Sequence, residues 1–148
     1  MRGTSRNHAG LARIESAGLE PAEADPDRPG TILELAADVT VVHWLLGSAD
    51  REPEAIAAIH GPRLERLLEK LVDSPVRGFV YEAAGSVPRD RLEQGAAIVD
   101  AAAARWRIPV RVVNADPGRF EPWLAAMLEA TLSLTGAAGS ASAAGWGK

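Results

Sequence analysis

Three short runs of β-branched, apolar and aromatic residues occur along the chain, at 39–46, 76–82 and 108–113. Such runs are typical of β-strands. The first run is apolar almost throughout, as expected for a strand that is covered on both faces, which is the usual situation in parallel sheets. The three runs therefore predict a buried parallel sheet.

Each run is followed by a segment in which apolar residues recur at helical spacing. A strand followed by a helix, three times in succession, requires right-handed parallel crossovers. The pattern therefore predicts a three-layer α/β fold with helices on both faces of the sheet. The three helical stripes are Leu64, Leu67, Leu68, Leu71 and Val72; Leu92, Ala96, Val99, Ala103 and Trp106; and Phe120, Trp123, Leu124, Met127, Leu128, Thr131 and Leu132.

The first part of the chain has shorter elements. Residues 2–6 are compatible with a strand, 7–17 with a helix that ends before Gly18, and 19–24 with another short strand. Glycine at this position is a common helix C-cap. We expect one α/β domain over 1–135. The remaining segment, 136–148, consists of Gly, Ala and Ser with one Trp and a terminal Lys, and we expect it to be disordered.

Charge and composition exclude several classes of function. The formal net charge is −4 and the 16 basic residues are scattered, so we expect no nucleic-acid partner. The chain has no cysteine, which excludes disulfides and thiolate metal sites. The longest apolar run is too short to cross a bilayer. We therefore expect a cytoplasmic protein that binds neither nucleic acid nor membrane.

Histidine positions give no indication of a metal site. His8, His43 and His60 lack the spacing of metal ligands. His43 lies in the middle of an apolar run, where we expect a hydrogen-bonded core residue. Trp44, Trp106 and Trp123 are likewise expected to pack in the core.

Five short motifs follow one another in an order that is similar to a known family. They are Arg-Gly-Thr-Ser-Arg at 2–6, Gly-Leu-Glu-Pro at 18–21 with Ala24-Asp25, Val-Val-His at 41–43, Arg-Gly-Phe-Val-Tyr at 77–81, and Ile-Pro-Val-Arg-Val-Val at 108–113. In this order they resemble the second to sixth strands of the Rossmann domain in the extended or atypical short-chain dehydrogenases, the NAD-dependent epimerase/dehydratase group. Each motif is short, and their order carries the resemblance.

The resemblance implies a dinucleotide cofactor. An arginine at the end of the family's second strand marks a preference for NADP, and Arg6 matches it. The hydroxyls of Thr4 and Ser5 with this guanidinium suit a ribose 2′-phosphate. Asp25 matches the aspartate that lies beside the adenine.

Ligands of open α/β sheets bind outside the carboxyl ends of the strands. Leu46, Gly47 and Glu82 follow or end predicted strands and are further candidates for contact with the cofactor. The alternative is that these are ordinary turn positions, which are polar in most proteins, and that Glu82 is solvated or paired with an arginine. The same alternative applies to the other polar residues at these ends, which are Ser48, Ser86, Asn114 and Asp116.

Part of the family's binding machinery has no counterpart. No G-x-G-x-x-G follows a predicted strand, and the chain begins at the family's second strand. The strand order 3-2-1-4-5-6 makes the first strand central. Without it, the second and fourth strands are either left unpaired or forced together. We expect an N-terminally incomplete form of a longer protein, or a degenerate relative.

The family's catalytic pair is also absent, and whether the chain is an enzyme stays open. These enzymes use a tyrosine with a lysine four residues later, which lowers the pKa of the tyrosine. The position four residues after Tyr81 is Gly85, and the only lysines are Lys70 and Lys148. The sequence does not support reductase activity of this kind.

Three hypotheses follow. The first is an NAD(P)-binding Rossmann-like protein related to nucleotide-sugar epimerases and dehydratases, without catalytic activity and with NADP as the cofactor. The second is a non-enzymatic interaction module whose incomplete sheet is completed by a partner chain or another copy. The third is a small hydrolase or isomerase that uses Glu82 and Asp116.

Overall fold

The computed structural model describes residues 1–136, in which strands and helices alternate except between residues 53 and 71, where two helices follow each other. Residues 137–148, nearly all of the segment for which a disordered tail is expected, lie outside this part. In chain order the elements are β1 (Arg2–Ser5), α1 (His8–Ser16), β2 (Glu20–Glu23), α2 (Pro29–Leu33), β3 (Val41–Trp44), α3 (Pro53–Ile59), α4 (Pro62–Leu71), β4 (Gly78–Glu82), α5 (Arg89–Trp106), β5 (Val110–Val113) and α6 (Phe120–Thr135).

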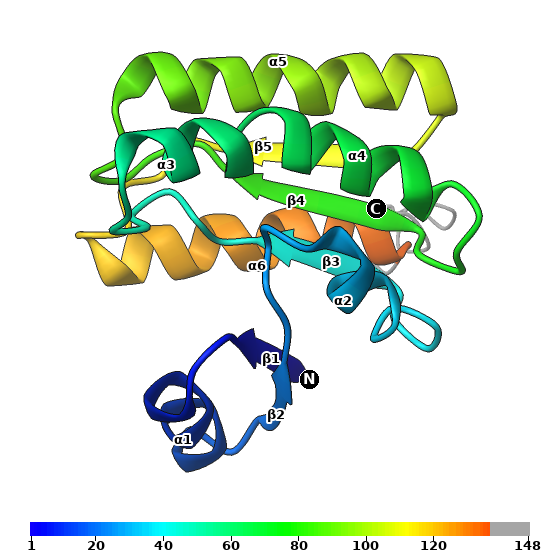
Figure 1. Ribbon diagram of the computed structural model, residues 1–148. Helices are drawn as coiled ribbons and strands as arrows, with labels where there is room; N and C mark the ends of the chain where they lie inside the picture. The colour runs from blue at the N-terminus through cyan, green and yellow to red at the C-terminus, as the bar shows by residue number, and fades with distance from the viewer. Residues whose placement is uncertain (137–148) are drawn as a thin grey trace.

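The larger sheet has the order β3-β4-β5, and all its strands are parallel. Helices α3, α4 and α5 cover one face and α6 covers the other, so this part has three layers (Figure 1). Every residue of the central strand β4 is buried. The predicted α/β fold with a parallel sheet and helices on both faces is confirmed.

Alternate residues of the strands point into two separate cores, as the pleat of a strand requires. Trp44, Phe79 and Tyr81 belong to the larger core, which includes the buried leucines of α4. Val80 and Val113 belong to the smaller core, under α6. The predicted inward stripes of α4 and α5 are therefore placed correctly for the most part, whereas much of the predicted stripe of α6 is exposed.

The strand predicted at 39–46 differs from the observed one. Only Val41–Trp44 forms a strand, and its first three residues are half-buried instead of fully buried. The reason is position, because β3 lies at one edge of its sheet while β4 lies at the centre. The amino-acid pattern suits an interior strand, but the structure places it at an edge.

The predicted strand, helix and strand at the start of the chain are confirmed within about one residue at each end. The side chain of Asn7 accepts a hydrogen bond from the N–H of Gly10 and so caps α1. Gly18, with φ of 83°, follows the helix in the left-handed conformation that favours glycine. The sequence also indicates a helical turn capped by Thr31, with Ile32, Leu33 and Leu35 inward. The structure has a short helix there, α2, which begins two residues earlier at Pro29. Helix α3 was not predicted, since it is only seven residues long.

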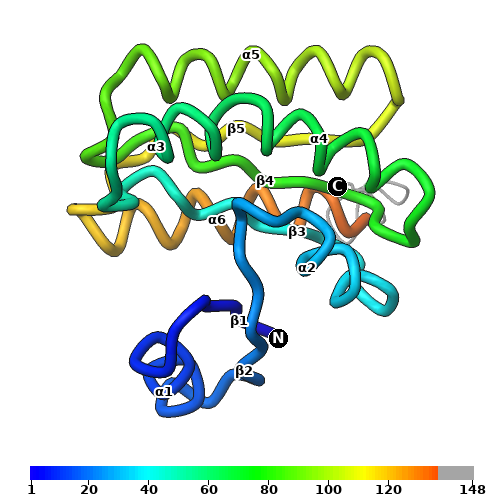
Figure 2. Tube along the Cα trace, in the orientation of Figure 1, coloured from blue at the N-terminus to red at the C-terminus, as the bar shows by residue number. Residues whose placement is uncertain are grey.

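A second sheet consists of β1 and β2 alone, which are also parallel. Figures 1 and 2 show this unit, with α1, beyond the β3 edge of the larger sheet, joined to it by the segment that leads into α2. Within residues 1–136 no ladder joins β1 to β3. β1 and β3 are therefore not paired with each other in this part of the chain.

The two units are nevertheless attached to each other by side chains. Arg2 of β1 donates to the carbonyl oxygen of Leu35 at 2.8 Å and pairs with Asp38 at 3.0 Å. Arg51, which precedes α3, pairs with Asp27 at 2.6 Å. These contacts link both ends of the smaller unit to the larger one. None of the helices in the described part is long and apolar enough to cross a membrane.

Candidate functional site

The loops that follow β3 and β4 interlock at the carboxyl edge of the sheet. The N–H of Val87 donates to the carbonyl oxygen of Gly47 at 3.0 Å. A Cβ atom on Gly47 would overlap the carbonyl oxygen of Ala84, and one on Gly85 would overlap the carbonyl of Gly47. Gly85 also has a φ of 141°, which side chains rarely adopt. The close approach of the two loops therefore requires glycine at both positions.

Glu82 lies beneath these loops and is 4% exposed. Its Oε1 accepts a hydrogen bond from the N–H of Gly47 at 3.0 Å, and its Oε2 accepts one from Nε1 of Trp123 at 2.7 Å. Both carboxylate oxygens are thus used within the protein. This arrangement fixes the loop after β3 to helix α6, while contact between Glu82 and a cofactor stays a prediction.

A buried histidine and tyrosine position the same loop from the other face. Nε2 of His60 donates to the carbonyl oxygen of Leu46 at 3.0 Å, and the hydroxyl of Tyr81 donates to Nδ1 at 2.6 Å. Burial lowers the pKa of His60, opposed by the bond to Leu46, and so favours the neutral ring. Burial, with the nearby charge of Glu82, raises the pKa of Tyr81.

The other predicted residues lie at the carboxyl end of the smaller sheet. Thr4 and Arg6 are exposed, and Ser5 is half-buried. Arg6 forms no ion pair with any residue in 1–136. Asp25 is half-buried, and its Oδ1 accepts the N–H of Asp27 at 2.9 Å. A side-chain hydroxyl and a guanidinium are therefore available at the end of β1.

The structure thus brings the predicted residues together in two groups. One consists of Thr4, Ser5, Arg6 and Asp25, and the other of Leu46, Gly47 and Glu82. The ion pair of Asp27 with Arg51 links the loops that carry the two groups. Both groups lie at the carboxyl ends of strands. The first group is at the ends of β1 and β2, and the second is at the ends of β3 and β4.

The unpaired edges of β1 and β3 mark a change of direction in the fold. From β3 the chain moves through β4 to β5, and from β1 it moves to β2, so both units extend away from the boundary between them. In open α/β sheets, ligands bind outside the carboxyl ends of strands at such a switch point. The two groups of residues flank that position.

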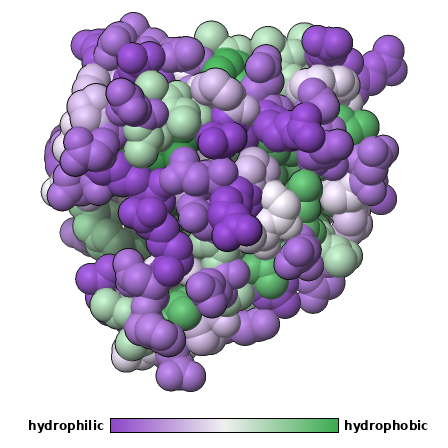
Figure 3. Space-filling view, viewed as in Figure 1, coloured by the Kyte–Doolittle hydropathy of each residue, from purple (hydrophilic) through white to green (hydrophobic). Residues whose placement is uncertain are grey.

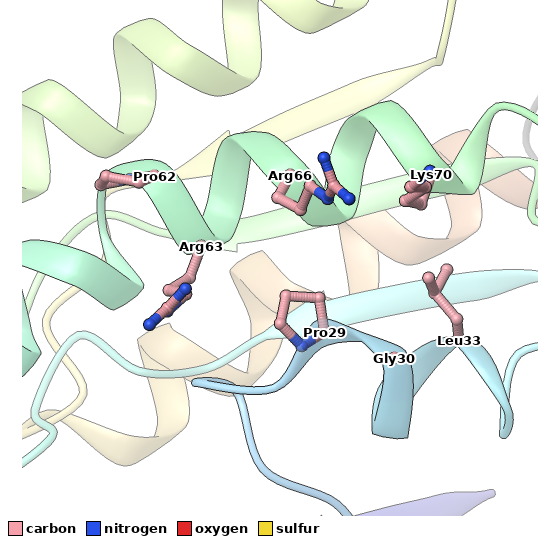
Figure 4. A pocket seen from close by; sticks show the side chains of 7 residues that line it. All are labelled: Pro29, Gly30, Leu33, Pro62, Arg63, Arg66 and Lys70. Carbon is pink, nitrogen blue, oxygen red and sulfur yellow. The ribbon is translucent and has the colours of Figure 1, made fainter.

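Two grooves add candidate ligand surfaces. One of about 370 Å³ lies at the carboxyl ends of β4 and β5 and includes Gly85 and the predicted residue Asn114. The other, of about 520 Å³, lies between α2 and α4, with Arg63, Arg66 and Lys70 along one side (Figure 4). None of these three cations forms an ion pair within the described chain. This second groove has the chemistry to hold an anion.

Local sequence patterns offer little indication of the residues that support the site. His60 follows α3, which was not predicted, and its partner Tyr81 lies in a different element. Trp123 was expected only in the core. His43, expected to be hydrogen-bonded, is half-buried, with Nε2 at 2.8 Å from the hydroxyl of Thr131. Among the residues that the structure describes, no three potential ligands cluster around a metal position.

Comparison with known proteins gives a match at the level of the fold. No protein-family model matches the chain, and neither does any curated protein. The crystal structure of gox2253 matches 76% of the chain with a TM-score of 0.60 and 17% identity. The triphenylmethane reductase of Citrobacter sp., complexed with NADP(H), matches 75% with a TM-score of 0.54 and 16% identity.

The chain spans 42% and 38% of the lengths of these two proteins. At such identities the likeness concerns the fold alone. The fold of this chain is therefore Rossmann-like, with parallel sheets flanked by helices, and one of the proteins that share it has been solved with NADP(H).

Proposed function

We propose that this chain binds a dinucleotide, with NADP preferred over NAD, as a Rossmann-like module related to nucleotide-sugar epimerases and dehydratases. The observation that carries the proposal is the position of Arg6. It is exposed at the carboxyl end of β1, beside the switch point, and has no acidic partner within residues 1–136. A guanidinium at this place, with the hydroxyls of Thr4 and Ser5, suits a 2′-phosphate.

The solved structures support the proposal in general terms, because a protein of this fold is complexed with NADP(H). The affinity of this chain alone is expected to be weak. In dinucleotide-binding folds the pyrophosphate is held by a glycine-rich turn and the helix that follows it. The described residues have no such turn after a strand.

We further propose that the chain does not catalyse reductase chemistry of the tyrosine–lysine type. Tyr81 is fully buried, and its hydroxyl donates to His60. The raised pKa of Tyr81 disfavours the ionised form that this chemistry needs. Gly85 occupies the position where the lysine would be.

Equilibrium titration of the 148-residue chain with NADPH and NADH tests the cofactor proposal. We expect weak binding of NADPH and still weaker binding of NADH, because only NADPH carries the 2′-phosphate. Equal affinities would contradict the role of Arg6. Absence of binding at millimolar NADPH would contradict cofactor binding by this chain.

A second function is favoured by the open edges of β1 and β3. Unpaired parallel edges present backbone donors and acceptors to another chain, and we propose an interaction module whose sheet is completed by a partner. Size-exclusion chromatography with light scattering, combined with limited proteolysis, tests it. A strict monomer that resists proteolysis without any partner argues against this function.

A further inference from the structure

The unpaired edges of β1 and β3 lie toward each other in Figure 1. Both strands are parallel to their neighbours, and Figure 1 shows their arrows running toward the same side of the molecule. Each strand is hydrogen-bonded in a ladder on one side only within the described residues. An additional strand in the same direction could therefore pair with β1 on one side and β3 on the other.

The residues of β3 are those of an interior strand. Val41 faces the core under α6, and Val42 and Trp44 face the core under α4. Edge strands usually carry charges, proline or bulges that prevent pairing with other chains. Residues 41–44 carry neither a formal charge nor proline, and their pairing with β4 is regular along all four positions. The edge of β3 is thus unprotected.

Helix α6 presents an apolar stripe that nothing in the described chain covers. Phe120, Leu124, Leu128 and Leu132 lie four residues apart and are 38% to 61% exposed. Large exposed apolar surface of this kind marks a contact with another element. The face of the molecule seen in Figure 3, by contrast, is mostly hydrophilic, with hydrophobic residues in small separate areas.

The stripe lies on the side of α6 that faces the open edge of β3. Met127 and Ala130 of α6 pack on the sheet, and successive helical residues are about 100° apart around the axis. On this scale Thr131 lies between the packed row and the exposed stripe. Its hydroxyl is 2.8 Å from Nε2 of His43, on β3. The stripe is therefore displaced from the packed row toward β3 and the open edge.

From these observations we infer that the chain takes up a strand–helix segment of a partner polypeptide. The strand inserts between β1 and β3, parallel to both, and is apolar on both faces. The helix that follows it packs beside α6 and covers the stripe of Phe120, Leu124, Leu128 and Leu132. This inference rests on the second proposed function, the interaction module, and specifies the chemistry of its partner.

A synthetic peptide is the probe. It has a strand of about five valine and isoleucine residues, a short turn, and an amphipathic helix of about fourteen residues with leucines on one face. The control peptide has proline at the centre of the strand, where it cannot donate to a ladder. Binding to the 148-residue chain is measured by fluorescence anisotropy, and the amides of β1 and β3 are followed by hydrogen exchange.

We expect the first peptide to bind and to slow exchange at both β1 and β3, and the proline peptide to do neither. The double variant Leu124→Glu, Leu128→Glu should weaken binding at least about tenfold, because burial of each leucine is lost. Both residues are exposed, and circular dichroism checks that the variant folds. Glu129→Lys, which also changes the charge of α6 by two units but lies away from the stripe, should leave binding unchanged.

Lack of binding, protection of only one of the two strands, or an unchanged affinity in the double variant would each overturn the inference. Light scattering separates its failure from that of the proposed function. A dimer in which the β3 amides are protected without peptide makes a second copy the occupant, which overturns the inference and keeps the interaction module. A protease-resistant monomer that does not bind the peptide contradicts both the inference and the proposed interaction module.

Discussion

Trp123 and Glu82 are joined by a hydrogen bond of 2.7 Å between helix α6 and the end of the central strand β4. The other carboxylate oxygen accepts the N–H of Gly47, in the loop after β3. One side chain therefore connects three elements that are far apart in the sequence. A buried carboxyl group thus helps to hold the loop at the carboxyl edge, together with the bonds that Val87 and His60 make to the carbonyl oxygens of this loop.

Glu82→Leu is expected to destabilise the fold by about 2–4 kcal/mol, because it leaves the buried N–H of Gly47 and the part-buried Nε1–H of Trp123 without acceptors. Glu82→Gln should cost less, since its amide oxygen still accepts one of the two bonds. Urea unfolding followed by tryptophan fluorescence measures both. The control is Glu121→Gln, on the exposed first turn of α6. Equal stability of Glu82→Leu and the parent chain would show that the bonds contribute nothing.

Stability is expected to fall as the pH falls below about 6.5, the ordinary pKa of histidine. Burial lowers the pKa of His60 and of His43 in the folded state. The unfolded chain therefore binds protons at a higher pH than the folded chain does, so the stabilisation present above pH 6.5 is lost on acidification. Thermal unfolding between pH 5 and pH 8 measures the effect.

The variant His60→Gln should reduce the dependence of stability on pH, because it removes one of the two histidines whose pKa is lowered in the folded state. His8→Gln, at an exposed position, is the matched control and should keep the full dependence. The expectation fails if the parent chain is equally stable on both sides of pH 6.5, or if the two variants behave alike.

Gly95→Ala is expected to destabilise the chain by about 1–3 kcal/mol, since overpacking of a rigid core forces neighbouring groups to move. A Cβ atom on Gly95 would overlap the hydroxyl of Tyr81, which is held by its bond to His60. Gly30→Ala is the control, because nothing lies within 4 Å of that position. Thermal unfolding of the two variants measures the difference. If Gly95→Ala is as stable as Gly30→Ala, the close contact between Gly95 and the hydroxyl of Tyr81 is contradicted.

Arg6→Ala is expected to weaken NADPH binding by roughly tenfold to a hundredfold, as loss of a charge-assisted hydrogen bond does. Binding of NADH should not change, because it has no 2′-phosphate. Arg13→Ala, at the other end of α1, is the control for the change in net charge. Isothermal titration calorimetry at fixed ionic strength measures binding by the parent chain and both variants. An equal loss of affinity for NADPH and NADH in Arg6→Ala would contradict the contact of Arg6 with the 2′-phosphate.

The local pattern of apolar and polar residues was sufficient to predict much of this fold. The sequence alone determined the fold class, because alternating strand and helix patterns leave few arrangements other than a parallel sheet between helices. It also determined the leucine face of α4 and the helix start at Asn7, whose short polar side chain accepts the N–H of Gly10. These features depend on neighbours within a few positions along the chain.

Only the tertiary structure decided which strand is central and which lies at an edge. The sequence of β3 is as apolar as an interior strand, yet within the described residues it is paired on one side only. The roles of Glu82, His60 and Trp123 were also decided there, since each depends on a partner more than twenty positions away or in another element. Burial and hydrogen bonding between distant segments have no local pattern, so only the folded chain shows them.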